Sequence, residues 1–247
     1  MTSYRRAGLT LFGDRARSRY APRFRALVAA GALCAAAPAT VQAGPDPCTG
    51  VGTVTCSGNQ SAGVENPPPG TTVLNVNTLT SDITPAIGSG QPGILFFGTG
   101  NLTLVSATSP FGIITSEDFV DGVVVASDGA VNVATSGNIS TKGLAANGIN
   151  LLSFAGGAVN LTSSSDISLA NGGGANGILA YSDGNVALTS KGAIFVTGDG
   201  TGISATAGNH VTVNSSGPIS ITGEGDAIDA SDIGGPAGGG GVSVISS

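Results

Sequence analysis

The chain contains few charged and few aromatic residues. Charged residues make up 10% of its 247 residues, whereas a typical globular domain has about 25%. There is no tryptophan, and aromatic residues account for 4% of the chain. The single histidine, His210, leaves few ligands for a cysteine–histidine metal site. Glycine is abundant, with 41 residues, but it lacks a strict three-residue period, which excludes a collagen triple helix.

Basic residues are concentrated at the start of the chain. All seven arginines lie within the first 25 residues, followed by an apolar run at Ala26–Pro38. Val41-Gln42-Ala43 then has the small-x-small pattern of a cleavage site. We therefore predict a secretory signal peptide over residues 1–43, because the apolar run is shorter than the ~20 residues needed to span a membrane. Arg5-Arg6 leaves a twin-arginine export route as an alternative.

The charge that remains after cleavage at Ala43 is strongly negative. Two lysines and 14 acidic residues remain, which gives a net charge of −12. Proteins bind nucleic acid mainly through lysine and arginine contacts to phosphate, and an acidic surface is also repelled by anionic membranes. We therefore expect no nucleic-acid partner.

The clearest pattern lies in Asn176–Gly225, which consists of two 25-residue copies of one motif. Within each copy, apolar residues occur in pairs two positions apart, which is typical of β-strands. Three such pairs, separated by Gly, Asn, Asp and Ser, predict three short strands and three corners per coil. Because the second copy repeats the first, equivalent residues should stack. This is the pattern of a parallel β-helix.

Related coils extend this ladder. Starts similar to x-Gly-Ile recur at intervals of 25 to 29 residues from Pro92 to Asp226, where the start reads Asp226-Ala227-Ile228. The predicted fold is all-β, a three-faced parallel β-helix, and right-handed because parallel crossovers have that hand. Its three predicted columns are Ile94, Val123, Ile149, Ile178, Ile203 and Ile228; Leu102, Val131, Val159, Val186, Val211 and Val242; and Ile113, Ile139, Ile167, Ile194 and Ile219. A degenerate coil in residues 71–91 has the apolar candidates Val73, Val76, Leu79 and Ile83.

The regions flanking the regular coils have different compositions. Residues 44–70 are predicted to be an N-terminal cysteine loop and a proline-rich lead-in, and residues 71–247 to be the β-helix repeats. Cys48 and Cys56 are expected to form a disulfide, because an exported protein reaches an oxidising compartment. The last coil is interrupted by a glycine-rich segment and lacks a third face. We therefore expect the repeats to be incomplete at the C-terminus and the chain to be a fragment.

The long basic signal peptide, the segment TVTCSGNQSAGV at Thr53–Val64 and the Gly/Asn/Ser-rich coils together suggest a family. The chain resembles the N-terminal passenger region of autotransporters, which are type V secreted surface proteins of Gram-negative bacteria. The resemblance implies export through the inner membrane, a C-terminal outer-membrane translocator barrel and display at the cell surface. A barrel shows alternating strands with aromatic girdles, and no aromatic residue follows Phe195. We expect the barrel to be missing from this chain, which alone would then reach only the periplasm.

Two groups of polar residues share corner columns. Asp199 and Glu224 occupy the same register in successive coils, with Asp226 close by. Stacked carboxylates about 5 Å apart could bind Ca²⁺ or serve as the acid pair of a retaining glycosidase. Acidic residues beside glycine are more often simple turn formers. Asn147 and Asn176 also share a column, where stacked amides are expected to form a hydrogen-bonded ladder.

The remaining chemistry favours a protein that is not an enzyme and needs no cofactor. His210 has no nucleophile motif near it, so a serine-hydrolase triad is not expected. Lys142 and Lys191 flank different corners, so they cannot act together on one substrate as a lyase would require. We expect an exported, adhesin-type stalk with an unknown surface ligand. A carbohydrate-active β-helix enzyme and a truncated relic without separate function are the alternatives.

Overall fold

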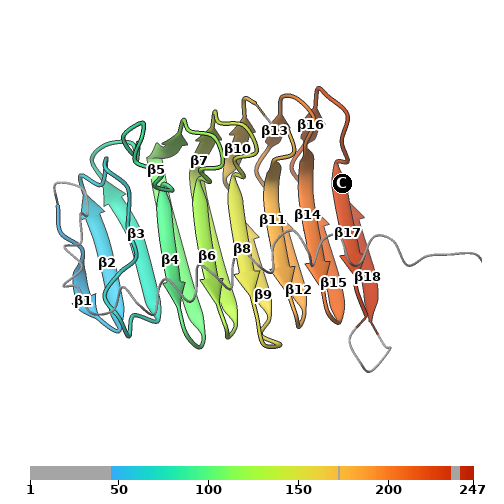
Figure 1. Cartoon of the computed structure of the whole chain (residues 1–247), viewed down its shortest axis with the longest axis horizontal. Helices are drawn as coiled ribbons and strands as arrows, with labels where there is room; N and C mark the ends of the chain where they lie inside the picture. The colour runs from blue at the N-terminus through green and yellow to red at the C-terminus, as the bar shows by residue number, and fades with distance from the viewer. Residues whose placement is uncertain (1–45, 172, 235–239) are drawn as a thin grey trace, which may run out of the picture. The chain divides into compact units, whose positions relative to one another are not determined.

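A computed structural model describes residues 46–171, 173–234 and 240–247. The signal peptide predicted for residues 1–43, with its cleavage site at Ala43, lies outside these residues. The described part is all-β, without a helix. Its strands form one 12-stranded and one 6-stranded sheet, and every pairing except that of the first two strands is parallel. Figure 1 shows the strands stacked coil upon coil, which confirms the predicted β-solenoid.

Each regular coil, from the one that begins with β4 to the one that ends with β16, contributes a strand to each of three faces. The first face is the 6-stranded sheet of β4 (Ile94–Gly98), β6 (Val123–Ser127), β8 (Ile149–Ser153), β11 (Asn176–Ser182), β14 (Thr201–Ala207) and β17 (Ile228–Asp232). The second face contains β2 (Thr53–Gly58), β3 (Val73–Leu79), β5 (Leu102–Thr115), β7 (Val131–Thr141), β9 (Val159–Ser163), β12 (Val186–Ser190), β15 (His210–Ser215) and β18 (Gly241–Ser246). The third face contains the ends of β5 and β7, with β10 (Asp166–Leu169), β13 (Ile194–Val196) and β16 (Ile219–Ile221).

The three predicted columns are confirmed residue by residue. Ile178 pairs with Ile149 and Ile203, Val186 with Val159 and Val211, and Ile194 with Ile167 and Ile219. Apart from Ile219, which is half-buried, these side chains are 0–1% exposed. β-Branched residues suit this interior, because their stiff side chains pack well on a pleated surface.

The degenerate coil differs from the prediction at one position. Val76, Leu79 and Ile83 face the core as predicted, but Val73 does not. Leu74 takes the inward position instead, because it pairs with the buried Leu104 in the next coil. An inward position in one strand must match an inward position in its neighbour, and a shift of one residue reverses the side chain's direction.

Inward-facing hydroxyl groups satisfy backbone carbonyls at the corners. Ser153 Oγ donates to the Gly129 carbonyl of the preceding coil at 2.7 Å, and Ser127 and Ser182 make equivalent bonds to the carbonyls of Gly100 and Gly157. Thr115 and Thr141 do the same at another corner, donating to the carbonyls of Val120 and Ala146 at 3.0 Å. A buried polar group without a partner is costly, so these bonds let the chain turn without opening the core.

The glycine of the x-Gly-Ile motif permits close stacking of the coils. A Cβ placed on Gly177 would lie 2.5 Å from the Gly202 carbonyl of the next coil and 2.5 Å from Ile194 Cγ2. Real side chains do not come this close to a backbone oxygen, so a larger residue would push the coils apart. In the last coil Ala227 occupies this column and is exposed.

The N-terminal end of the ladder is covered by the cysteine segment. β1 (Thr49–Val51) pairs antiparallel with β2, and β2 pairs in parallel with β3, so the ladder extends upstream of residue 71. The predicted disulfide is confirmed between Cys48 and Cys56, with a Cα–Cα distance of 4.2 Å. Gln60 is fully buried beside it and donates from Nε2 to the carbonyls of Asp46 and Ser57, at 2.8 and 2.9 Å.

Candidate functional site

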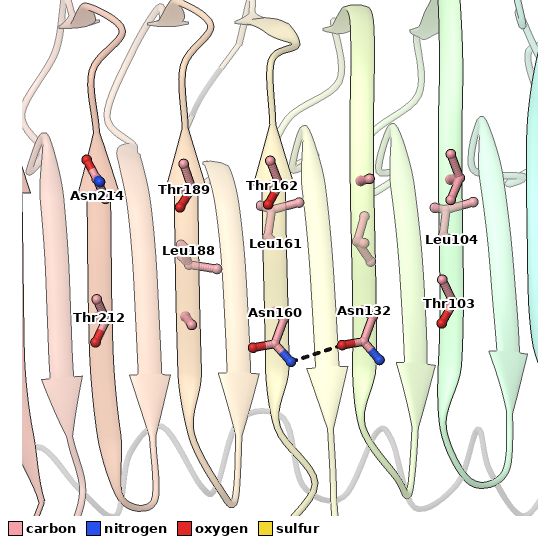
Figure 2. Close-up of a pocket in the computed structure, with 14 residues that line it drawn as sticks. Thr103, Leu104, Asn132, Asn160, Leu161, Thr162, Leu188, Thr189, Thr212 and Asn214 are labelled. Carbon is pink, nitrogen blue, oxygen red and sulfur yellow. Dashed lines mark hydrogen bonds between the residues drawn. The ribbon is translucent and has the colours of Figure 1, made fainter.

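The outward side of the second face carries a shallow groove. It has a volume of about 440 Å³ and crosses β5, β7, β9, β12 and β15. Every residue that lines it is a threonine, asparagine, alanine, valine or leucine, so the lining contains no ionisable group. Figure 2 shows the polar side chains standing on successive parallel strands.

The strand register places the outward residues in two straight rows. One row is Thr103, Asn132, Asn160, Ala187 and Thr212, and the other is Val105, Ala134, Thr162, Thr189 and Asn214. Neighbouring strands lie about 4.8 Å apart, and the two rows are separated by two residues along each strand, or about 6.6 Å. The groove is therefore a regular array of side chains rather than a cavity that closes around a compact molecule.

Most of the polar groups in this array are available to a ligand. One side-chain hydrogen bond joins two groove residues within the described part, from Asn160 Nδ2 to Asn132 Oδ1 at 3.0 Å (Figure 2). Asn160, Thr162 and Asn214 are exposed, and Thr189 is half-buried. A hydroxyl can donate one hydrogen bond and accept two, and a primary amide can donate two and accept two.

The corner that carries Asp199, Glu224 and Asp226 is built differently. Asp199 Oδ1 accepts a hydrogen bond from the backbone N–H of Glu224 at 2.9 Å, so the carboxylate links two coils. All three side chains are exposed. No group of three or more histidine, cysteine, aspartate or glutamate side chains is close enough to hold a metal ion in the described ranges. The geometry thus adds no support to the calcium hypothesis and assigns Asp199 a structural contact.

A polar ladder along the first face was only partly predictable. The predicted amide stacking is confirmed, because Asn176 Nδ2 donates to Asn147 Oδ1 at 2.9 Å. The ladder continues to Asp121, whose Oδ1 accepts from Asn147 N and Nδ2 at 2.6 and 3.0 Å. Asn150 Nδ2 donates to Asp121 Oδ2 at 2.7 Å, while the buried Asn150 Oδ1 has no partner among the described residues. Burial raises the pKa of the Asp121 carboxyl, and the bonds from Asn150 and Asn147 oppose this shift.

The residues considered for catalysis remain apart. His210 is exposed at the start of β15, and its backbone N–H donates to Asn185 Oδ1 at 3.3 Å. Lys142 and Lys191 are exposed. The Lys142 N–H donates to the Thr115 carbonyl on the third face, and the Lys191 N–H donates to the Ser163 carbonyl on the second face. Nothing in the described ranges places either lysine or His210 in the groove.

The groove was missed by sequence reasoning, although a signal was present. The outward residues alternate with the predicted core columns, and they lie at the same offsets in each coil. Asn132 and Asn160 follow their core valines by one residue, and Thr162 and Thr189 follow theirs by three. The amide and hydroxyl groups at these offsets could have been aligned once the core columns were known.

Comparisons with protein-family models, with curated proteins and with solved structures gave no match. In the described part of the chain there is also no helix long and apolar enough to cross a membrane.

Proposed function

We propose that this chain is an exported, non-enzymatic passenger-like β-helix that acts as a stalk and presents a binding face, in the manner of a surface adhesin. The observation that carries this proposal is the uncharged, regular side-chain array on the second face, supported by coils that stack without interruption. A rigid solenoid holds such a face straight over many coils, because each coil is bonded to both neighbours.

The basic and apolar N-terminal segment supports export through the inner membrane. The resemblance to autotransporter passengers adds an outer-membrane translocator as the expected partner and the cell surface as the destination. Without a translocator the periplasm is the expected location. The disulfide between Cys48 and Cys56 fits each of these oxidising locations.

Export can be tested by expressing the full chain in a Gram-negative host and identifying the N-terminal residue of the mature protein. We expect Gly44 at the N-terminus and the protein outside the cytoplasm. Ala43→Leu should block cleavage, because the processing site requires a small residue. Ala39→Leu, in the same segment but outside the small-x-small site, is the matched control and should be processed normally.

Display is tested at the native locus with an antibody against residues 46–171. Labelling of intact cells supports surface display, whereas labelling only after the outer membrane is permeabilised indicates the periplasm. A cytoplasmic chain that retains residues 1–43 would overturn the proposal. Release of sugar from neutral or acidic polysaccharides, lost in Asp199→Asn, would replace it with the enzyme alternative.

A further inference from the structure

The groove on the second face is uncharged although the molecule around it is acidic. The chain downstream of residue 43 carries 14 acidic residues and two lysines, and none of them lines the groove. An anionic polymer or a second copy of the chain would therefore approach against the net charge, while a neutral ligand would not be repelled. Charge thus favours a neutral partner.

The polar groups of the groove match a ligand that is rich in hydroxyl groups. Hydroxyls of Thr162, Thr189 and Thr212 and the amide of Asn214 both donate and accept hydrogen bonds, and none of them bonds to another groove side chain. Between them lie small apolar surfaces, including Ala134 and Ala187. A sugar presents the same combination, because its hydroxyl groups alternate with C–H surfaces.

The spacing of the array favours an extended polymer. The strands recur about 4.8 Å apart, and each of the five strands from β5 to β15 supplies at least one outward threonine or asparagine. This repeat is close to the length of one sugar ring in an extended, β-linked chain. A small molecule would use one or two strands, whereas a polysaccharide lying across the strands would contact all five.

We propose that this groove binds a neutral, extended, β-linked polysaccharide, whose chain lies across β5, β7, β9, β12 and β15 with its hydroxyl groups bonded to the threonine and asparagine side chains of the two rows. The inference extends the proposed surface function by naming a ligand class. It is tested on purified protein, so failure of export or display would not affect the result, and failure to bind would leave the stalk function intact.

The test is affinity electrophoresis of the purified full chain in native gels that contain soluble polysaccharide. Hydroxyethyl cellulose and carboxymethyl cellulose share one β-linked backbone, but only the second is anionic. We expect hydroxyethyl cellulose to retard the protein in a concentration-dependent manner and carboxymethyl cellulose to have much less effect. The double variant Thr162→Val/Thr189→Val removes two hydroxyl groups with little change in shape, and each loss should weaken binding about five-fold.

Thr197→Val is the matched control, because it makes the same chemical change at an exposed threonine that follows β13, outside the groove. It should bind as the unaltered chain does, and circular dichroism should show that all variants remain folded. The proposal is overturned if the unaltered chain is not retarded, if the double variant binds normally, or if both polymers bind equally. Self-association that the double variant abolishes would instead identify the groove as an interface between two copies.

Discussion

The central coils and the last coil have the same residue types in the same columns, but their side chains are buried to different degrees. Ile178 and Val186 are 0% and 1% exposed, whereas Val242 is 48% exposed. Val242 pairs with Val211 in the predicted register, so local structure is unchanged. The difference arises because a solenoid side chain is covered from both neighbouring coils, and no described strand follows β18.

The first coil resembles the central coils in this respect. Val54 is 1% exposed even though it stands near the beginning of the ladder. β1 pairs along one edge of β2, and the disulfide between Cys48 and Cys56 holds this segment in place. Contact with a neighbouring coil or segment, rather than residue type, therefore decides how much each apolar column stabilises the fold.

The largest expected effect comes from truncating the same side chain in the two regions. Ile178→Ala should lower the free energy of unfolding by about 3–4 kcal/mol, because it leaves a cavity between two coils. Ile228→Ala, in the same column but in the last coil where the side chain is only half-buried, should cost about 1 kcal/mol. Urea unfolding followed by circular dichroism measures both. Equal costs would show that the last coil is covered in solution.

The disulfide can be removed to make the first coil more like the last. Replacing Cys48 and Cys56 together with serine should lower stability by about 2–3 kcal/mol, because the unfolded chain regains the entropy of a short closed loop. Hydrogen exchange should become faster in β1 and β2 while the central coils stay protected. If exchange in β11 and β12 rises equally, the ends and the centre unfold as one unit.

The smallest expected effect concerns the buried carboxylate. Because burial raises the pKa of Asp121 in the fold, the ionised group costs stability at neutral pH. As the pH falls through the raised pKa towards 3.8, the folded protein takes up the proton and this cost is lost. The unaltered chain should therefore gain stability relative to Asp121→Asn over that interval. The exposed Asp226 stands in the same column of the last coil, so Asp226→Asn is the matched control.

The regular parts of the fold could be predicted because they depend on local alternation and on a fixed repeat length. Spacing alone predicted the columns of Ile178, Val186 and Ile194. The disulfide was predicted because an exported protein reaches an oxidising compartment. Val73 was placed wrongly, because its coil is irregular and the inward position there is set by pairing with Leu104. Asp121 was missed because its burial and its bonds to Asn147 and Asn150 join residues 26 and 29 positions apart.

The strand period, the stacking of equivalent apolar residues and the pairing of Cys48 with Cys56 follow from residue types and their spacing along the chain. The tertiary structure decided which side chains are covered, which polar residues become a ladder and which form an open groove. Alternation along a strand assigns each side chain to the inside or the outside. Burial and binding surfaces arise only when separate coils stack about 4.8 Å apart, and this is why Asn160 and Thr189 became part of one array.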